Sequence, residues 1–170
     1  MLLLLLFCAI EDFIFLLLLY IYMNSNLYKT QFITFIVMTI MGMLFNPMNI
    51  LAYRFTDLYL SLTLFYGGLL MASNMIWGHE IIHYLSMGHC NMLVFSVGII
   101  LSISISILLL RQQLIVDDKQ WLRRMIPHHS TALTTTHNIY NRTGNPQIKE
   151  LAKKIIDTQE KEIQLMKSML

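Results

Sequence analysis

The sequence predicts an all-α protein, with a membrane-embedded helical region over residues 1–110 and a C-terminal antiparallel helical hairpin over residues 111–170. Three observations predict this fold. The chain is 56% hydrophobic with a mean hydropathy of +0.58, which is too apolar for an ordinary soluble domain. Charge is concentrated in the C-terminal segment, which holds 10 of the 12 Lys and Arg residues. In that segment apolar residues recur at helical spacing on either side of a turn signal.

Four apolar runs in the N-terminal region are candidate membrane helices: residues 2–23, 32–45, 58–77 and 92–110. The last two approach the roughly 20 residues needed to cross a bilayer, and the second needs flanking residues to do so. The first carries Glu11 and Asp12, each costing about 2.5–3.5 kcal/mol at the membrane centre, against many favourable Leu, Ile and Phe residues. We therefore expect three or four transmembrane helices in an integral, multi-pass membrane protein, whose sidedness the few loop charges do not fix.

Clear start and stop signals bound the two C-terminal helices. Asp117 has capping-box spacing with the glutamine three residues later, so the first helix begins there. It ends near Arg142, because Gly144 tolerates positive φ and Asn145 is a good N-cap. Pro146 suits the first position of the second helix, which continues to near the end of the sequence.

The first helix of the predicted hairpin has two adjacent histidines in its apolar stripe. With Met125 at the centre of the stripe, His128 and His129 follow on the same side of a 3.6-residue helix. Pro127 lies on the outer face, with arginines beside it. Both imidazoles are therefore expected at core positions, where a polar side chain needs a hydrogen-bond partner or a ligand.

The second helix of the predicted hairpin carries the matching polar residues. Gln159 and Glu162 interrupt its apolar stripe, and Met166 follows one turn later. Antiparallel pairing about the glycine turn places His129 opposite Gln159 and brings Met125 within a turn of Met166. Imidazole nitrogen and thioether sulfur suit a soft or borderline transition metal. The alternative is that each histidine is a hydrogen-bonded core residue.

Residues 118–170 resemble the histidine-rich, ferritin-like domain family known as domain of unknown function number three hundred and five. The resemblance rests on two motifs: Met125-Ile126-Pro127-His128-His129 followed by Ala132, and Ile155-Ile156 followed by Gln159, Glu162-Ile163, Met166 and Leu170. The Met-rich membrane region, which ends just before this domain, is similar to the anchor of membrane-bound members.

The resemblance implies binding of copper or silver, because characterised members of this family are copper- and silver-binding proteins of the bacterial envelope. The implied ligands are Met125, His128, His129 and Met166. His137 and Met169 are weaker candidates. Gln159 and Glu162 would fix the imidazole tautomers by hydrogen bonding.

The family resemblance also implies half of a four-helix ferritin-like bundle. Family domains have four helices, whereas this chain supplies two, so one apolar flank of the hairpin stays uncovered. A homodimer that pairs two hairpins would complete the bundle, and packing against the membrane surface is the alternative. Other members carry further methionines after the histidine pair, where this chain has Thr134, Thr135 and Thr136. The number of bound ions therefore stays open.

A second histidine cluster, outside the hairpin, has the H-E-x-x-H spacing. On a helix His79 and His83 share a face, as zinc binding requires, and Glu80 could act as general base to a bound water. This spacing favours an alternative function, a membrane zinc peptidase, with His89 at the distance of a third ligand. Against it, Ser86 stands where a metzincin site needs glycine. Other candidates for the third ligand are Glu11, Asp12 and Asp57.

The same segment also has soft donors at every fourth position, namely Met71, Met75, His79, His83 and Met87. These residues form one slowly turning stripe on a helix, which makes His79 and His83 weaker candidates for metal contact. Methionine in an apolar helix also serves as gap-filling packing. If residues 92–110 cross the bilayer, this cluster lies on the surface opposite the hairpin.

Other functional classes find little support in the sequence. It contains no glycine-rich phosphate loop, no nucleophile elbow and no Cys-x-x-Cys. The basic residues of the hairpin suit anionic lipid headgroups, and they lack the aromatic neighbours that nucleic-acid binding would need. We therefore expect a membrane-anchored copper- or silver-binding protein, with the lipid bilayer and a second copy as partners and no catalytic residue. Besides the zinc peptidase, the remaining alternative is a structural membrane protein that dimerises through satisfied core histidines.

Overall fold

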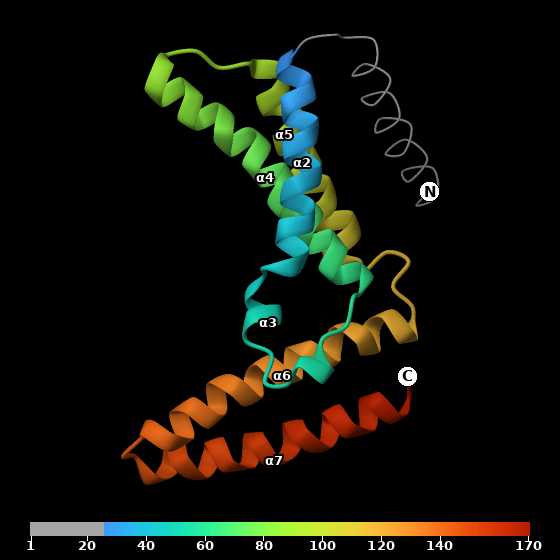
Figure 1. Cartoon of the computed structure of the whole chain (residues 1–170), viewed down its shortest axis with the longest axis vertical. Helices are drawn as coiled ribbons and strands as arrows, with labels where there is room; N and C mark the ends of the chain where they lie inside the picture. Colours follow the sequence, from blue (N-terminus) through green and yellow to red (C-terminus); the bar gives the residue numbers. More distant parts are fainter. Residues whose placement is uncertain (1–25) are drawn as a thin grey trace.

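The computed structural model describes residues 26–170, and this part of the chain is helical without strands (Figure 1). The predicted all-α fold class is confirmed. In chain order the elements are α2 (Asn26–Leu44), α3 (Pro47–Ile50), the 3-10 turn η1 (Phe55–Asp57), α4 (Leu62–Met87), α5 (Met92–Ser104), the π-helical continuation η2 (Ile105–Arg111), α6 (Asp118–Arg142) and α7 (Pro146–Ser168). The apolar run 2–23, with Glu11 and Asp12, lies outside the described residues.

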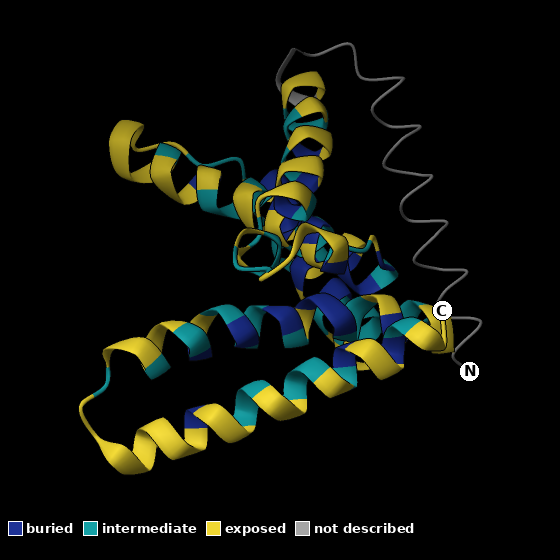
Figure 2. Cartoon of the chain, turned by 60° about the horizontal axis from the view of Figure 1, so that its bottom comes forward, coloured by how far each residue is buried: buried dark blue, intermediate teal, exposed yellow. Residues whose placement is uncertain are grey.

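The helices form two groups, with α2, α4 and α5 packed together and α6 and α7 lying side by side across one end of them (Figure 1). The central helix is α4, which contacts both α2 and α5. Two helices of the described chain are long and apolar enough to cross a membrane, over Lys29–Ile50 and Met92–Arg111. In each, only 17% of the most apolar window is buried, so most of these residues are at least partly exposed (Figure 2).

The expectation of three or four membrane-crossing helices is therefore corrected to two candidates within the described residues. The run 58–77 does not qualify, although it falls largely within a helix of 26 residues. The reason is that α4 continues into polar residues such as Asn74, His79 and Glu80, which lower its hydropathy.

Small residues bring the backbones of α2 and α4 into direct contact. A Cβ added to Gly68 would lie 2.5 Å from the carbonyl oxygen of Thr39, and one added to Gly42 would lie 3.0 Å from the Cα of Gly68. Between α4 and α5 a Cβ on Gly98 would lie 3.0 Å from the backbone nitrogen of Trp77. Glycine is required at these positions because any side chain would force the helices apart.

The caps of α6 and α7 are those that the sequence predicts. The Asp117 carboxylate accepts the Gln120 N–H at 2.7 Å, and the Asn145 side chain accepts the Gln147 N–H at 2.9 Å. Between the helices the chain leaves α6 through Thr143 in an extended conformation. Gly144 does not adopt the positive φ allowed for in the sequence analysis, because Thr143 and Asn145 already make the turn.

The core of the α6–α7 pair is a small apolar cluster made of Leu122, Ile126, Leu133, Ile163 and Met166. A second face of α6 is also buried, because the connection between α2 and α4 lies against it. The Thr131 hydroxyl donates to the carbonyl oxygen of Met48 at 3.2 Å, and the Arg124 guanidinium contacts the Met48 sulfur. Pro127 is buried, not outward-facing as expected, because α6 packs against this connection as well as against α7.

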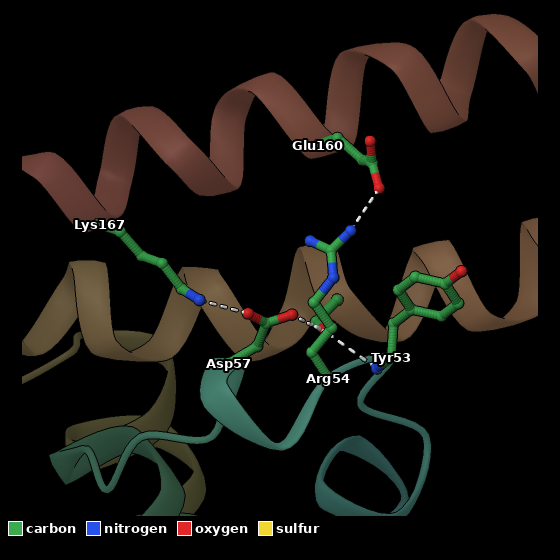
Figure 3. Close-up of polar contacts among 6 residues, drawn as sticks. Tyr53, Arg54, Asp57, Glu160 and Lys167 are labelled. Carbon is green, nitrogen blue, oxygen red and sulfur yellow. Dashed lines mark hydrogen bonds and ion pairs between the residues drawn. The ribbon is translucent and has the colours of Figure 1, made fainter.

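A buried carboxylate joins this connection to both C-terminal helices (Figure 3). Asp57 is fully buried and accepts a hydrogen bond from the Ser130 hydroxyl of α6 at 2.6 Å and from Lys167 Nζ of α7 at 2.6 Å. The Ser130 oxygen in turn accepts the Tyr53 backbone N–H at 2.8 Å. Near this carboxylate, exposed Arg54 pairs with Glu160 at 2.7 Å.

The position of Asp57 corrects one candidate role. It cannot supply a third zinc ligand to His79 and His83, because it precedes the start of α4 and they lie near its end. At 1.5 Å per residue, His79 is roughly 25 Å along the helix axis from the first residue of α4.

Replacing Gly68 with alanine should destabilise the contact between α2 and α4, since the new methyl group collides with the Thr39 backbone. We expect a loss of about 1–3 kcal/mol, typical of overpacking. The measurement is the unfolding of the protein in a mild detergent. Gly67→Ala is the matched control, because nothing lies within 4 Å of its added Cβ. Equal stability of the two variants would contradict the close contact.

Asp57→Ala should detach the α2–α4 connection from the C-terminal pair. Because Lys167 can turn partly into solvent, we expect a loss of about 1–3 kcal/mol and not the full cost of an unpaired buried charge. The control is Glu160→Gln, whose exposed pair should contribute less than about 1 kcal/mol. Hydrogen exchange should rise at Tyr53 in the first variant and stay unchanged in the second.

Candidate metal site

His129 points from α6 toward α7 and meets a carboxylate there. Its Nδ1 lies 3.0 Å from Glu162 Oε2, and the His129 side chain is 15% exposed. The angle of approach falls outside hydrogen-bond geometry, so this nitrogen has an ion-pair contact without a satisfied hydrogen bond. Gln159, expected opposite His129, does not bond to it, and its buried Oε1 is without a partner in the described chain.

His128 is exposed, so the expectation that both imidazoles occupy the core is wrong for this residue. The cause is the second buried face of α6. Its buried residues, among them Ile126, Ser130 and Leu133, centre about 90° around the helix from Met125. This rotation leaves His129 near the buried edge and turns His128 outward. The two rings remain neighbours, with centroids 5.8 Å apart and an interplanar angle of 61°.

The methionines proposed as ligands divide into two groups. Met166 is buried in the apolar cluster, and Met125 is partly buried against the same cluster. Met169 is exposed at the end of α7. Among residues 26–170 no three His, Cys, Asp or Glu side chains converge as a metal site. A site between α6 and α7 would therefore have to include methionine sulfur.

The weaker candidate His137 contacts the α2–α4 connection. Its ring stacks on Tyr53 of the α2–α4 connection, with centroids 4.8 Å apart and an interplanar angle of 11°. Its Nε2 is buried without a hydrogen-bond partner in the described chain. The structure thus separates His137 from the His128–His129 pair.

Electrostatics favour an uncharged His128. Burial of part of its ring lowers its pKa below the ordinary 6.5, and the neighbouring charges of His129 and Arg124 lower it further. A neutral imidazole is the form that binds metal. Burial also lowers the pKa of Arg124, which stays charged near neutrality.

The H-E-x-x-H cluster lies at the other end of α4, far from α6 and α7 (Figure 1). Glu80 is buried, and its Oε2 accepts the Asn91 N–H at 2.9 Å at the start of α5. This carboxylate therefore joins two helices and does not face water beside the imidazoles, as the general base of a peptidase would. His79 is exposed and His83 is partly buried.

Comparison with known proteins places the α6–α7 region in a family. Residues 110–170 match the family described as "Domain of unknown function (DUF305)". Residues 110–170 of this protein form a DUF305 domain. It is also 41% identical over 128 residues to an uncharacterized protein of Acanthamoeba polyphaga mimivirus, an alignment that covers 74% of this chain and 81% of the viral protein. The similarity to this relative thus extends well beyond the DUF305 segment. No solved structure matches the chain.

His128 should titrate below 6.5 in histidine NMR spectra of the full-length protein recorded as a function of pH. Because the unfolded chain takes up this proton first, the folded state should lose stability as the pH falls through 6.5, until His128 itself is protonated. His129→Ala removes one cause of the lowered pKa and should raise it. A His128 pKa at or above 6.5 in the unsubstituted protein would contradict this account.

Proposed function

We propose that this DUF305 protein is a membrane-anchored metal-binding protein that holds copper(I) or silver(I) between α6 and α7. The observation that carries the proposal is the placement of His129, nearly buried, with Glu162 at its Nδ1 and His128 beside it. Such an arrangement leaves His129 Nε2 available to an ion, because the carboxylate favours a proton on Nδ1.

The surrounding donors suit a soft ion. Met125 and Met166 border one apolar cluster, and thioether sulfur with neutral imidazole nitrogen is a ligand set for monovalent copper. The lowered pKa of His128 favours the uncharged ring. The buried Gln159 Oε1 lacks a hydrogen-bond partner in the described chain. An unsatisfied acceptor of this kind costs about 1–3 kcal/mol, which pairing on metal binding would recover.

The apolar exterior supports anchoring in a bilayer. The helices over Lys29–Ile50 and Met92–Arg111 leave most of their residues at least partly exposed, as helices in lipid do. Charged residues gather in α6 and α7, which lie across one end of these helices (Figure 1). The pair would therefore rest at one surface of the membrane.

A homodimer would complete the helical bundle in this proposal. The outward face of α7 exposes Ile148, Leu151 and Leu165, and Figure 2 shows most of this helix uncovered. A second α6–α7 pair packed there would join the two half-bundles into one four-helix, ferritin-like bundle.

The test is titration of the purified full-length protein with Ag⁺ in detergent micelles, followed by calorimetry. The variant His128→Ala/His129→Ala should lose the Ag⁺ equivalents that belong to this site. His137→Ala, which removes a histidine on another face of α6, is the matched control and should keep them. Unchanged Ag⁺ stoichiometry in the double variant would refute the ligand assignment.

A second pair of variants tests the sulfur donors in the same titration. Met166→Leu keeps the volume of a buried side chain while removing its thioether, so it should weaken Ag⁺ binding with little loss of stability. Met169→Leu changes an exposed residue of the same type and should bind as the unsubstituted protein does. Equal affinities would exclude Met166 as a ligand.

A further inference from the structure

The loop after α4 folds back over the last turns of that helix. Gly88 ends α4 in the left-handed conformation, with φ of 69°, and its N–H bonds to the carbonyl oxygen of Tyr84. The loop is then held at two points. The His89 carbonyl oxygen lies 2.7 Å from His83 Nδ1, and the Asn91 N–H donates to Glu80. His89 is thereby fixed above the helix face that carries His83.

The contact between His83 and the loop determines which nitrogen of the ring carries the proton. A carbonyl oxygen can only accept, so His83 Nδ1 is the donor and holds the hydrogen. In the neutral ring the lone pair then lies on Nε2. A ring that donates one N–H to a backbone carbonyl while offering the other nitrogen is the usual arrangement of a metal-binding histidine.

Three imidazoles lie near one another at this end of α4, although as they stand they do not converge on one point. The ring centroids of His79 and His83 are 6.4 Å apart, and those of His83 and His89 are 5.8 Å apart at an interplanar angle of 84°. Two rings bonded to one ion at about 2.0–2.1 Å have centroids roughly 5–6 Å apart. His79 and His89 are exposed, so rotation of their side chains can close the remaining distance.

We propose that His79, His83 and His89 form a second metal site, for a borderline divalent cation such as Zn²⁺. Imidazole nitrogen suits zinc, copper(II) and nickel, and the three rings would leave a fourth position to water. The site uses different residues and a different class of ion from the one between α6 and α7. It is a binding site without hydrolysis, because Glu80 is buried against Asn91.

Zinc binding by the full-length protein in detergent micelles tests the proposal. After equilibrium dialysis against ZnCl₂, elemental analysis should find one Zn²⁺ per chain that His79→Gln/His83→Gln loses. The variant His128→Ala/His129→Ala should keep this Zn²⁺, which separates the present proposal from the one for α6 and α7. Circular dichroism verifies that each variant remains helical. No zinc uptake by the unsubstituted protein, or equal uptake by His79→Gln/His83→Gln, would overturn the site.

A variant that keeps all three imidazoles tests the role of the loop. Gly88→Ala strains the left-handed turn and should displace His89, so zinc affinity should fall several-fold. Gly78→Ala is the control, because its added Cβ meets nothing within 4 Å and its φ is not positive. Nitrogen NMR of His83 should also report an Nδ1–H tautomer before zinc is added. The opposite tautomer, or equal zinc affinity in both glycine variants, would contradict the proposed geometry.

Discussion

The arrangement of this molecule depends on the buried carboxylate of Asp57. A charge removed from water is tolerated only when it is paired and hydrogen-bonded, and here Ser130 and Lys167 meet the two oxygens from two different helices. The contacts hold α6 and α7 against the α2–α4 connection. That packing buries a second face of α6, and the rotation that results separates the environments of His128 and His129. A polar contact remote from the candidate ligands thus decides how they are presented.

Features set by residues close together in the chain could be predicted from the sequence. The caps at Asp117 and Asn145 are present, and Glu162 meets His129 as a carboxylate partner should. The predictions were wrong where a segment distant in the sequence packs against α6. The exposure of His128 and the burial of Pro127 both follow from contacts with residues more than 70 positions away in the chain. Helical periodicity can identify an apolar stripe, but it cannot reveal that a second surface will be covered, and nothing in the residues around Asp57 names Ser130 or Lys167 as its partners.

The two histidine groups illustrate how the same residue type acquires different chemistry. Beside His129 are a carboxylate and an apolar cluster with two methionines, which favours a soft, monovalent ion. Beside His83 is a backbone carbonyl, and the nearby carboxylate of Glu80 is engaged by Asn91. An H-E-x-x-H string therefore need not be a peptidase motif, since the middle acid can serve to join two helices. Spacing identifies candidate ligands, while the partner of each carboxylate decides what they can do.

The contact of Gly68 with the backbone of Thr39 has a mechanical consequence for the whole chain. The two backbones cannot approach more closely there, and α4 runs from its contact with α6 at Leu62 to His79, about 25 Å further along at 1.5 Å per residue. Packed helices with hard contacts shift as units and do not deform gradually. A tilt of α4 about Gly68 would therefore move its two ends together, in opposite directions.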